Sequence, residues 1–74
     1  MYLIKDLAML SNFSVYTIKF YLKEGLIKET GRSPETNFRY FDDTTLRQLK
    51  RIREERLKGR SIKEIKFILG KEQS

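Results

Sequence analysis

Three side chains between residues 14 and 24 have the chemistry and spacing to contact a polyanion. Tyr16, Lys19 and Lys23 lie three to four residues apart, which places them on one side of a helix. Ammonium groups pair with phosphate, and a tyrosine can meet a base edge or a thymine methyl group. This face therefore predicts contact with a charged polymer.

A short helix over residues 14–24 must position these side chains. Ser14 is its predicted N-cap, because the hydroxyl can accept a hydrogen bond from a free N–H of the first turn. Gly25 is its predicted end, because glycine readily adopts the left-handed conformation that closes a helix. The opposite side is apolar and predicts packing through Val15, Ile18 and Leu22.

A second amphipathic helix is predicted just upstream, over residues 4–10. Leu7 and Ala8 are expected against the helix at 14–24, and Phe13 is expected to turn inward. Only residues 11–13 connect the two helices, and Asn12 there tolerates a positive φ. The layout predicts a helix-turn-helix whose second helix enters the major groove of DNA.

The composition predicts one small domain, residues 1–74, with a polyanionic partner. Sixteen Lys and Arg residues against ten Asp and Glu give a net charge of +6. Without Cys or His, zinc fingers and thiol chemistry are excluded, and no metal or cofactor is expected. No nucleophile with a partner is visible, so no enzyme is predicted. No signal segment or membrane span is apparent, and we expect a cytoplasmic protein.

Residues 26–41 predict a β hairpin, or wing. Leu26 and Ile27 begin an extended pair, residues 28–37 are rich in turn formers, and residues 38–41 form an aromatic return strand.

Two further helices are predicted after the wing. Asp42 caps the first, over residues 43–58, which has an inner stripe of Leu46, Leu49, Ile52 and Leu57 and ends at Gly59. Its many basic residues, among them Arg47, Lys50, Arg51 and Arg53, are predicted mainly as a solvated face. A Ser61–Glu64 capping box opens the second helix, over residues 62–69, which Gly70 ends. The fold class is mainly α with a small β wing: a winged helix-turn-helix followed by two further helices.

Four segments resemble the MerR family of bacterial transcription regulators. Residues 17–27 (TIKFYLKEGLI) resemble T-[IL]-R-[YF]-Y-E-x-x-G-L-[IL], and residues 37–42 (NFRYFD) resemble [GN]-Y-R-x-Y-[DT]. Residues 4–8 (IKDLA) resemble I-G-E-L-A, and residues 59–65 (GRSIKEI) resemble G-F-S-L-E-E-I. The chain departs from these patterns where Lys19 replaces Arg, Phe38 replaces Tyr and Arg60 replaces Phe.

The resemblance implies a regulator that binds promoter DNA, usually as a dimer on an inverted repeat, and bends and untwists it. RNA polymerase would then be an indirect partner. The protein would be associated with the nucleoid. The family's dimerisation helix would begin after Leu69, so a homodimer is expected only if a longer native chain supplies that helix.

The predicted DNA-contacting residues combine helix position with the resemblance. Each has a plain structural alternative: Ser14 as a cap alone, Tyr16 covering the core edge, Lys19 as a solvated cation, Tyr21 as a half-buried residue, and the wing arginines as charge balance. Phe20 and Phe41 are expected in the core. The candidate set is Ser14, Tyr16, Thr17, Lys19, Tyr21, Arg32 and Arg39.

Two other functions remain open for such a fold. An excisionase-like or architectural winged helix would bind recombination-site DNA instead of a promoter. A protein-interaction winged helix would show no salt-dependent affinity for DNA.

Overall fold

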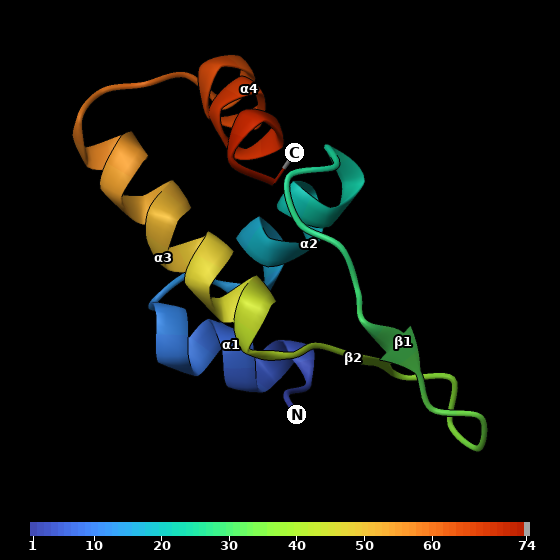
Figure 1. The fold of residues 1–74 in the computed structure, drawn as a ribbon. Helices are drawn as coiled ribbons and strands as arrows, with labels where there is room; N and C mark the ends of the chain where they lie inside the picture. Colours follow the sequence, from blue (N-terminus) through green and yellow to red (C-terminus); the bar gives the residue numbers. More distant parts are fainter. Residues whose placement is uncertain (74) are drawn as a thin grey trace.

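The computed structural model describes residues 1–73 and has the predicted order of elements. A winged helix-turn-helix followed by two further helices is confirmed. The β hairpin extends away from the helices, and α3 runs past α1 and α2 toward α4 (Figure 1). The elements are α1 (Ile4–Ser11), α2 (Val15–Lys23), β1 (Gly31–Arg32), β2 (Arg39–Tyr40), α3 (Asp43–Leu57) and α4 (Ile62–Gln73).

The ends of α1 and α2 follow the local signals in the sequence. The N–H of Thr17 donates to the Ser14 hydroxyl at 3.1 Å, which confirms the N-cap of α2. Asn12 has a φ of 63° and Gly25 a φ of 78°, so both turn positions are left-handed as predicted. The Asp6 carboxylate accepts from the N–H of Leu3 at 2.9 Å and satisfies a free donor at the start of α1.

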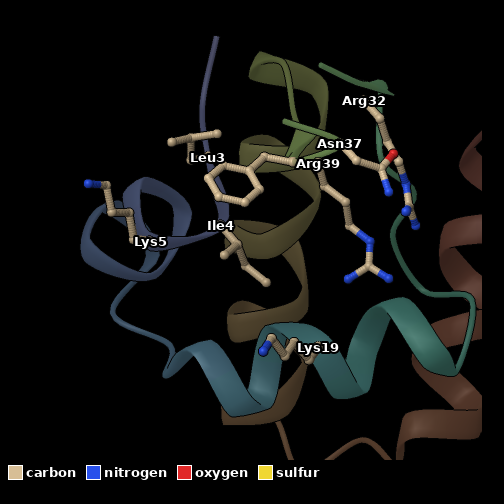
Figure 2. A pocket seen from close by; sticks show the side chains of 8 residues that line it. Leu3, Ile4, Lys5, Lys19, Arg32, Asn37 and Arg39 are labelled. Carbon is tan, nitrogen blue, oxygen red and sulfur yellow. The ribbon is translucent and has the colours of Figure 1, made fainter. Parts of the chain in front are cut away.

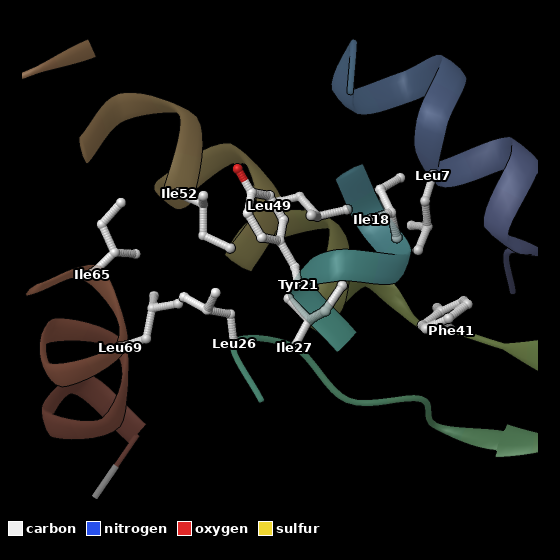
Figure 3. Close-up of a cluster of buried hydrophobic side chains, with 10 residues drawn as sticks. All are labelled: Leu7, Ile18, Tyr21, Leu26, Ile27, Phe41, Leu49, Ile52, Ile65 and Leu69. Carbon is white, nitrogen blue, oxygen red and sulfur yellow. The ribbon is translucent and has the colours of Figure 1, made fainter. Parts of the chain in front are cut away.

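The core lies where all four helices meet the chain that leads into and out of the wing (Figure 3). Phe41, after β2, is fully buried, as expected. The backbones of Tyr2 and Phe41 exchange two hydrogen bonds, of 2.8 and 2.7 Å, and so tie the start of the chain to the end of the wing. The side chains that are fully excluded from solvent include Leu7, Ile18, Leu49, Ile52 and Ile65.

Two residues expected in the core are exposed instead. Leu57 is 80% exposed, because it follows Ile52 by five positions and so leaves the inward side of α3. Glu55, three positions after Ile52, takes that inward place. Phe20 on α2 is 40% exposed, since the inward positions of that helix are filled by Ile18 and Tyr21.

The wing is shorter than predicted. Each strand has only two residues, paired antiparallel as Gly31 with Tyr40 and Arg32 with Arg39. Leu26 and Ile27 do not form the predicted extended pair; they are buried in the core directly after the turn at Gly25. The apolar character of these two residues therefore reflects burial and not strand pairing.

The last helix is longer than predicted, so the expectation that Gly70 ends it is wrong. Gly70 does not adopt a positive φ, and α4 continues through it to Gln73. One further turn brings Glu72 to Arg51 of α3, where Oε1 lies 2.8 Å from Nη2. The Ser61–Glu64 capping box at the start of α4 is confirmed by hydrogen bonds of 3.3 and 3.2 Å.

A buried carboxylate organises the junction of α3 and α4. Glu55 is only 2% exposed and accepts from Arg51, from Lys58 at 3.3 Å and from Arg60 at 2.6 Å. Arg60, which replaces the Phe of the family pattern, thus pairs with a buried carboxylate. The basic residues of α3 are therefore not simply a solvated face, since Arg51 pairs with Glu55 of the same helix and with Glu72 of α4.

Candidate nucleic-acid interface

The exposed side of α2 presents an aromatic and a cationic group one turn apart. Tyr16, in the first turn, is 82% exposed and therefore does not cover the edge of the core. Lys19 is also exposed. The hydroxyl groups of Ser14 and Thr17 are 2.9 Å apart and hydrogen bonded, so the N-terminus of α2 displays two coupled polar groups beside Tyr16.

The two wing arginines share one carboxylate. Glu29 Oε1 lies 3.0 Å from Arg32 Nε, and Glu29 Oε2 lies 2.9 Å from Arg39 Nε. The hydrogen bond from Arg32, with the charges of both arginines, holds the pKa of Glu29 below its ordinary value. Glu29 is therefore ionised at neutral pH and lies between two cations.

A concave groove of about 420 Å³ lies between the start of α1, the middle of α2 and the wing. Figure 2 shows Arg39 reaching from the wing toward α2, with Lys5 and Lys19 on the helices around the same hollow. Four cationic side chains thus surround a partly apolar floor. The lining residues are Leu3, Ile4, Lys5, Lys19, Arg32, Asn37, Phe38 and Arg39.

The basic surface continues past the groove. A second open hollow, of about 800 Å³, shares Lys19 and Arg39 with the first and adds Lys23 and Lys28. Glu29 is the acidic residue in its lining. Cationic side chains therefore follow a continuous path from α1, along α2, to the base of the wing, an arrangement that suits the regularly spaced phosphates of a nucleic acid.

Three of the seven predicted contact residues line the groove, and Tyr21 lies in the core instead. The groove brings together Lys19, Arg32 and Arg39, whereas Tyr21 is only 4% exposed. Its ring packs edge-on against Phe13 at 5.4 Å between ring centroids. Burial raises the pKa of Tyr21. Tyr21 is therefore buried more deeply than the half-buried alternative to a DNA contact.

Three residues of the basic path belonged neither to the predicted α2 face nor to the predicted contacts: Lys5, Lys28 and Glu29. Lys5 has no signal in sequence spacing, because it reaches the groove only through the angle between α1 and α2. Lys28 and Glu29 follow the turn at Gly25 and resemble ordinary loop residues. The Glu29–Thr30–Gly31–Arg32 spacing is compatible with an ion pair but does not predict that Arg39 joins it.

No group of three or more metal-ligating side chains occurs within residues 1–73. In the same range, no helix is both long and apolar enough to cross a membrane.

Comparison with known proteins identifies the family. Residues 2–72 match the model of the MerR HTH family regulatory proteins. The chain belongs to the MerR family. No curated protein sequence matches it.

Solved structures of MerR-family regulators have the same fold. The transcription regulator PbrR691 from Ralstonia metallidurans, solved with lead(II), is 36% identical and superposes with a TM-score of 0.88 over 99% of this chain. The Haemophilus regulator HiNmlR, which lacks the sensor domain and was solved bound to promoter DNA, is 33% identical, with a TM-score of 0.82 over 93%. A MerR-family regulator from Bacillus cereus is 26% identical, with a TM-score of 0.80 over 92%.

The similarity covers only part of each relative. This chain spans 56% of the PbrR691 chain, 52% of HiNmlR and 50% of the Bacillus cereus regulator. It is a MerR-type helix-turn-helix domain about half the length of these proteins.

Proposed function

We propose that this MerR domain binds duplex DNA by placing α2 in the major groove and the β1–β2 wing along the adjacent backbone. The observation that carries the proposal is that Lys5, Lys19, Arg32 and Arg39 line one groove. These side chains come from α1, α2 and the two strands of the wing, so a phosphate chain that crosses the groove can contact several elements of the domain. Release of counterions from that chain supplies sequence-independent affinity.

Family membership supports a promoter as the target. HiNmlR, whose structure contains promoter DNA, superposes on nearly the whole of this chain. A MerR domain with the same arrangement of helix-turn-helix and wing can present the same surfaces to a duplex.

The proposed contacts divide into those that position the domain on the DNA and those that read the base sequence. Lys19, Arg32 and Arg39 pair with phosphates and set the register of the domain. Tyr16 and Thr17 occupy the first turn of α2, the end of a recognition helix that meets base edges. Ser14, at the same end, lies where the free N–H groups of the helix favour a phosphate. Tyr21 acts only through the core that supports α2.

Selection from a pool of random duplex DNA tests sequence-specific binding. We expect the chain to retain DNA at low salt and to enrich a defined motif after several rounds, with retention falling steeply as salt rises. Failure to retain duplex DNA at low salt would contradict the proposal. A retained pool that stays random would contradict its sequence-specific part.

We also propose the wider roles that accompany promoter binding in this family. They are distortion of the promoter in the bacterial cytoplasm, indirect action on RNA polymerase, and assembly as a homodimer through sequence beyond residues 1–74. The solved relatives are about twice as long as this chain, which leaves room for such sequence in a longer protein. Sedimentation of the 74-residue chain should show a monomer or a weak dimer. A tight dimer at micromolar concentration would place the dimer interface within these residues.

A further inference from the structure

The register of the wing places two like charges directly opposite each other. Arg32 on β1 pairs with Arg39 on β2 in a sheet that has only these two residue pairs. Like charges at facing positions destabilise a strand pair, and a two-stranded hairpin is itself marginal. A carboxylate placed between the two guanidinium groups relieves this repulsion.

Glu29 offsets the repulsion with a single carboxylate. One oxygen lies 3.0 Å from Arg32 Nε and the other 2.9 Å from Arg39 Nε, so the carboxylate bridges the two strands. All three side chains are between 32% and 43% exposed. A charge pair this exposed contributes little stability by itself, so its importance lies in geometry.

Both contacts use the Nε edge of a guanidinium group. An arginine anchored at Nε keeps its two terminal nitrogens available for a planar, bidentate contact with phosphate. Within residues 1–73, neither Arg32 nor Arg39 has a second carboxylate partner. Figure 2 shows the terminal nitrogens of Arg39 extending into the groove toward α2.

We propose that Glu29 is a positioning residue for DNA binding, which fixes Arg32 and Arg39 in the orientation that receives the phosphate backbone. This inference rests on the proposed function. In the bound state the carboxylate stays on the Nε edges while phosphate oxygens meet the terminal nitrogens. The entropy of ordering two long side chains is then lost on folding and not on binding.

When Glu29 is removed, a positioning role and a purely electrostatic role predict opposite changes in DNA affinity. Glu29 is a negative charge within a basic path, and if it acted only through that charge, its removal would strengthen DNA binding and steepen the salt dependence. If it positions the arginines, its removal weakens binding and flattens the salt dependence, although the chain becomes more positive.

The matched control is Glu35, in the turn of the same wing. Glu35 is exposed, and Glu35→Gln removes the same charge as Glu29→Gln. The dissociation constant of each 74-residue variant for one mixed-sequence duplex is measured over a range of salt concentrations. We expect Glu29→Gln to bind about 3- to 10-fold more weakly than the wild type and to have a smaller salt slope. This range of affinity corresponds to the free energy of immobilising long side chains on binding. Glu35→Gln should bind at least as tightly as the wild type.

A second variant, Glu29→Asp, separates the charge of residue 29 from the length of its side chain. It also keeps the proposal testable if Glu29→Gln does not fold. Glu29→Asp keeps the charge but is too short to bridge both arginines, so we expect weaker binding with the helices intact by circular dichroism. In an Arg32→Ala, Arg39→Ala background, Glu29→Gln should have no further effect. Wild-type or tighter binding by Glu29→Gln or Glu29→Asp would overturn the inference and leave the DNA-binding proposal standing. Absence of duplex binding by the wild type would instead contradict the proposed function itself.

Discussion

Arg53 of α3 lies over the ring of Phe13, with its guanidinium carbon 4.6 Å from the ring centroid. Its Nε and Nη2 donate to the carbonyl oxygens of Ser11, at 3.2 Å, and Asn12, at 2.9 Å. These carbonyls belong to the end of α1 and the turn that follows, where helical partners are missing. One side chain of α3 therefore holds the turn that sets the angle between α1 and α2.

Arg53→Ala should destabilise the domain. It removes two hydrogen bonds from a charged donor and one cation–π contact, for which we expect a loss of about 2 kcal/mol in the free energy of unfolding. Urea denaturation followed by circular dichroism measures this loss. Arg47→Ala, on the exposed side of the same helix, is the control and should change stability by less than about 0.5 kcal/mol. Equal effects of the two substitutions would contradict a special role for Arg53 at the turn.

Glu55 should make stability depend on pH. Burial alone would raise its pKa, but hydrogen bonds from Lys58 and Arg60 outweigh burial, and the pKa lies below the ordinary 4.5. A depressed pKa contributes stability that is present above the unfolded value and is lost as pH falls through the folded value.

Thermal unfolding of Glu55→Gln across pH checks this contribution. The difference in Tm between wild type and variant should be largest near neutral pH and should shrink below about pH 4. The control is Glu54→Gln, because the Glu54 carboxylate is 65% exposed and 3.8 Å from Arg51. Its Tm should differ little from that of the wild type at every pH. A constant difference between wild type and Glu55→Gln at every pH would show that the variant loses packing and not an ionised carboxylate.

Gly31→Ala should impair the wing without unfolding the helices. A Cβ at Gly31 would lie 2.6 Å from Cζ of Tyr40 and would also clash with its hydroxyl oxygen, so the Tyr40 ring must move. We expect several-fold weaker duplex binding with little change in Tm. Gly70→Ala meets nothing within 4 Å in α4 and should raise stability by about 0.5 to 1 kcal/mol with binding unchanged. A Gly31→Ala protein that binds DNA like the wild type would contradict this expectation and show that the Tyr40 ring moves aside without disturbing the interface.

Substitutions on α2 should separate reading from positioning. Lys19→Ala should weaken binding to all sequences and lower the salt slope by about 0.9, because a phosphate contact carries little sequence information. Tyr16→Ala should cost about 1 to 3 kcal/mol on the selected motif and much less on scrambled DNA, with the slope nearly unchanged. If both substitutions reduce specific and non-specific binding by the same factor, Tyr16 only positions the helix.

Local signals predicted the helix-turn-helix well because they depend on neighbouring residues. Ser14, Asn12 and Gly25 each satisfy a requirement of the nearby backbone, and each adopts the expected conformation. Gly70 shows the limit of such signals. Glycine is compatible with a helix end, but α4 continues through Gly70, and Glu72 in its last turn pairs with Arg51 of α3.

The site depended on relationships that sequence spacing does not contain. Tyr16, Lys19, Arg32 and Arg39 were predicted as contacts from helix position and family resemblance, and their role in DNA binding stays a prediction. The buried position of Tyr21, the contribution of Lys5 and the bridge made by Glu29 all depend on angles between elements. Those angles are set by packing, which a periodic pattern does not specify.

The chemical shifts of the isotope-labelled chain during titration with duplex DNA test the account most directly, because they report which surface is covered. We predict that the largest changes fall on Lys5, on residues 14–19 of the α2 region and on the wing from Glu29 to Arg39, with little change on the exposed side of α4 around Phe67. Changes centred on α4 and the end of α3, or none at low salt, would contradict the account.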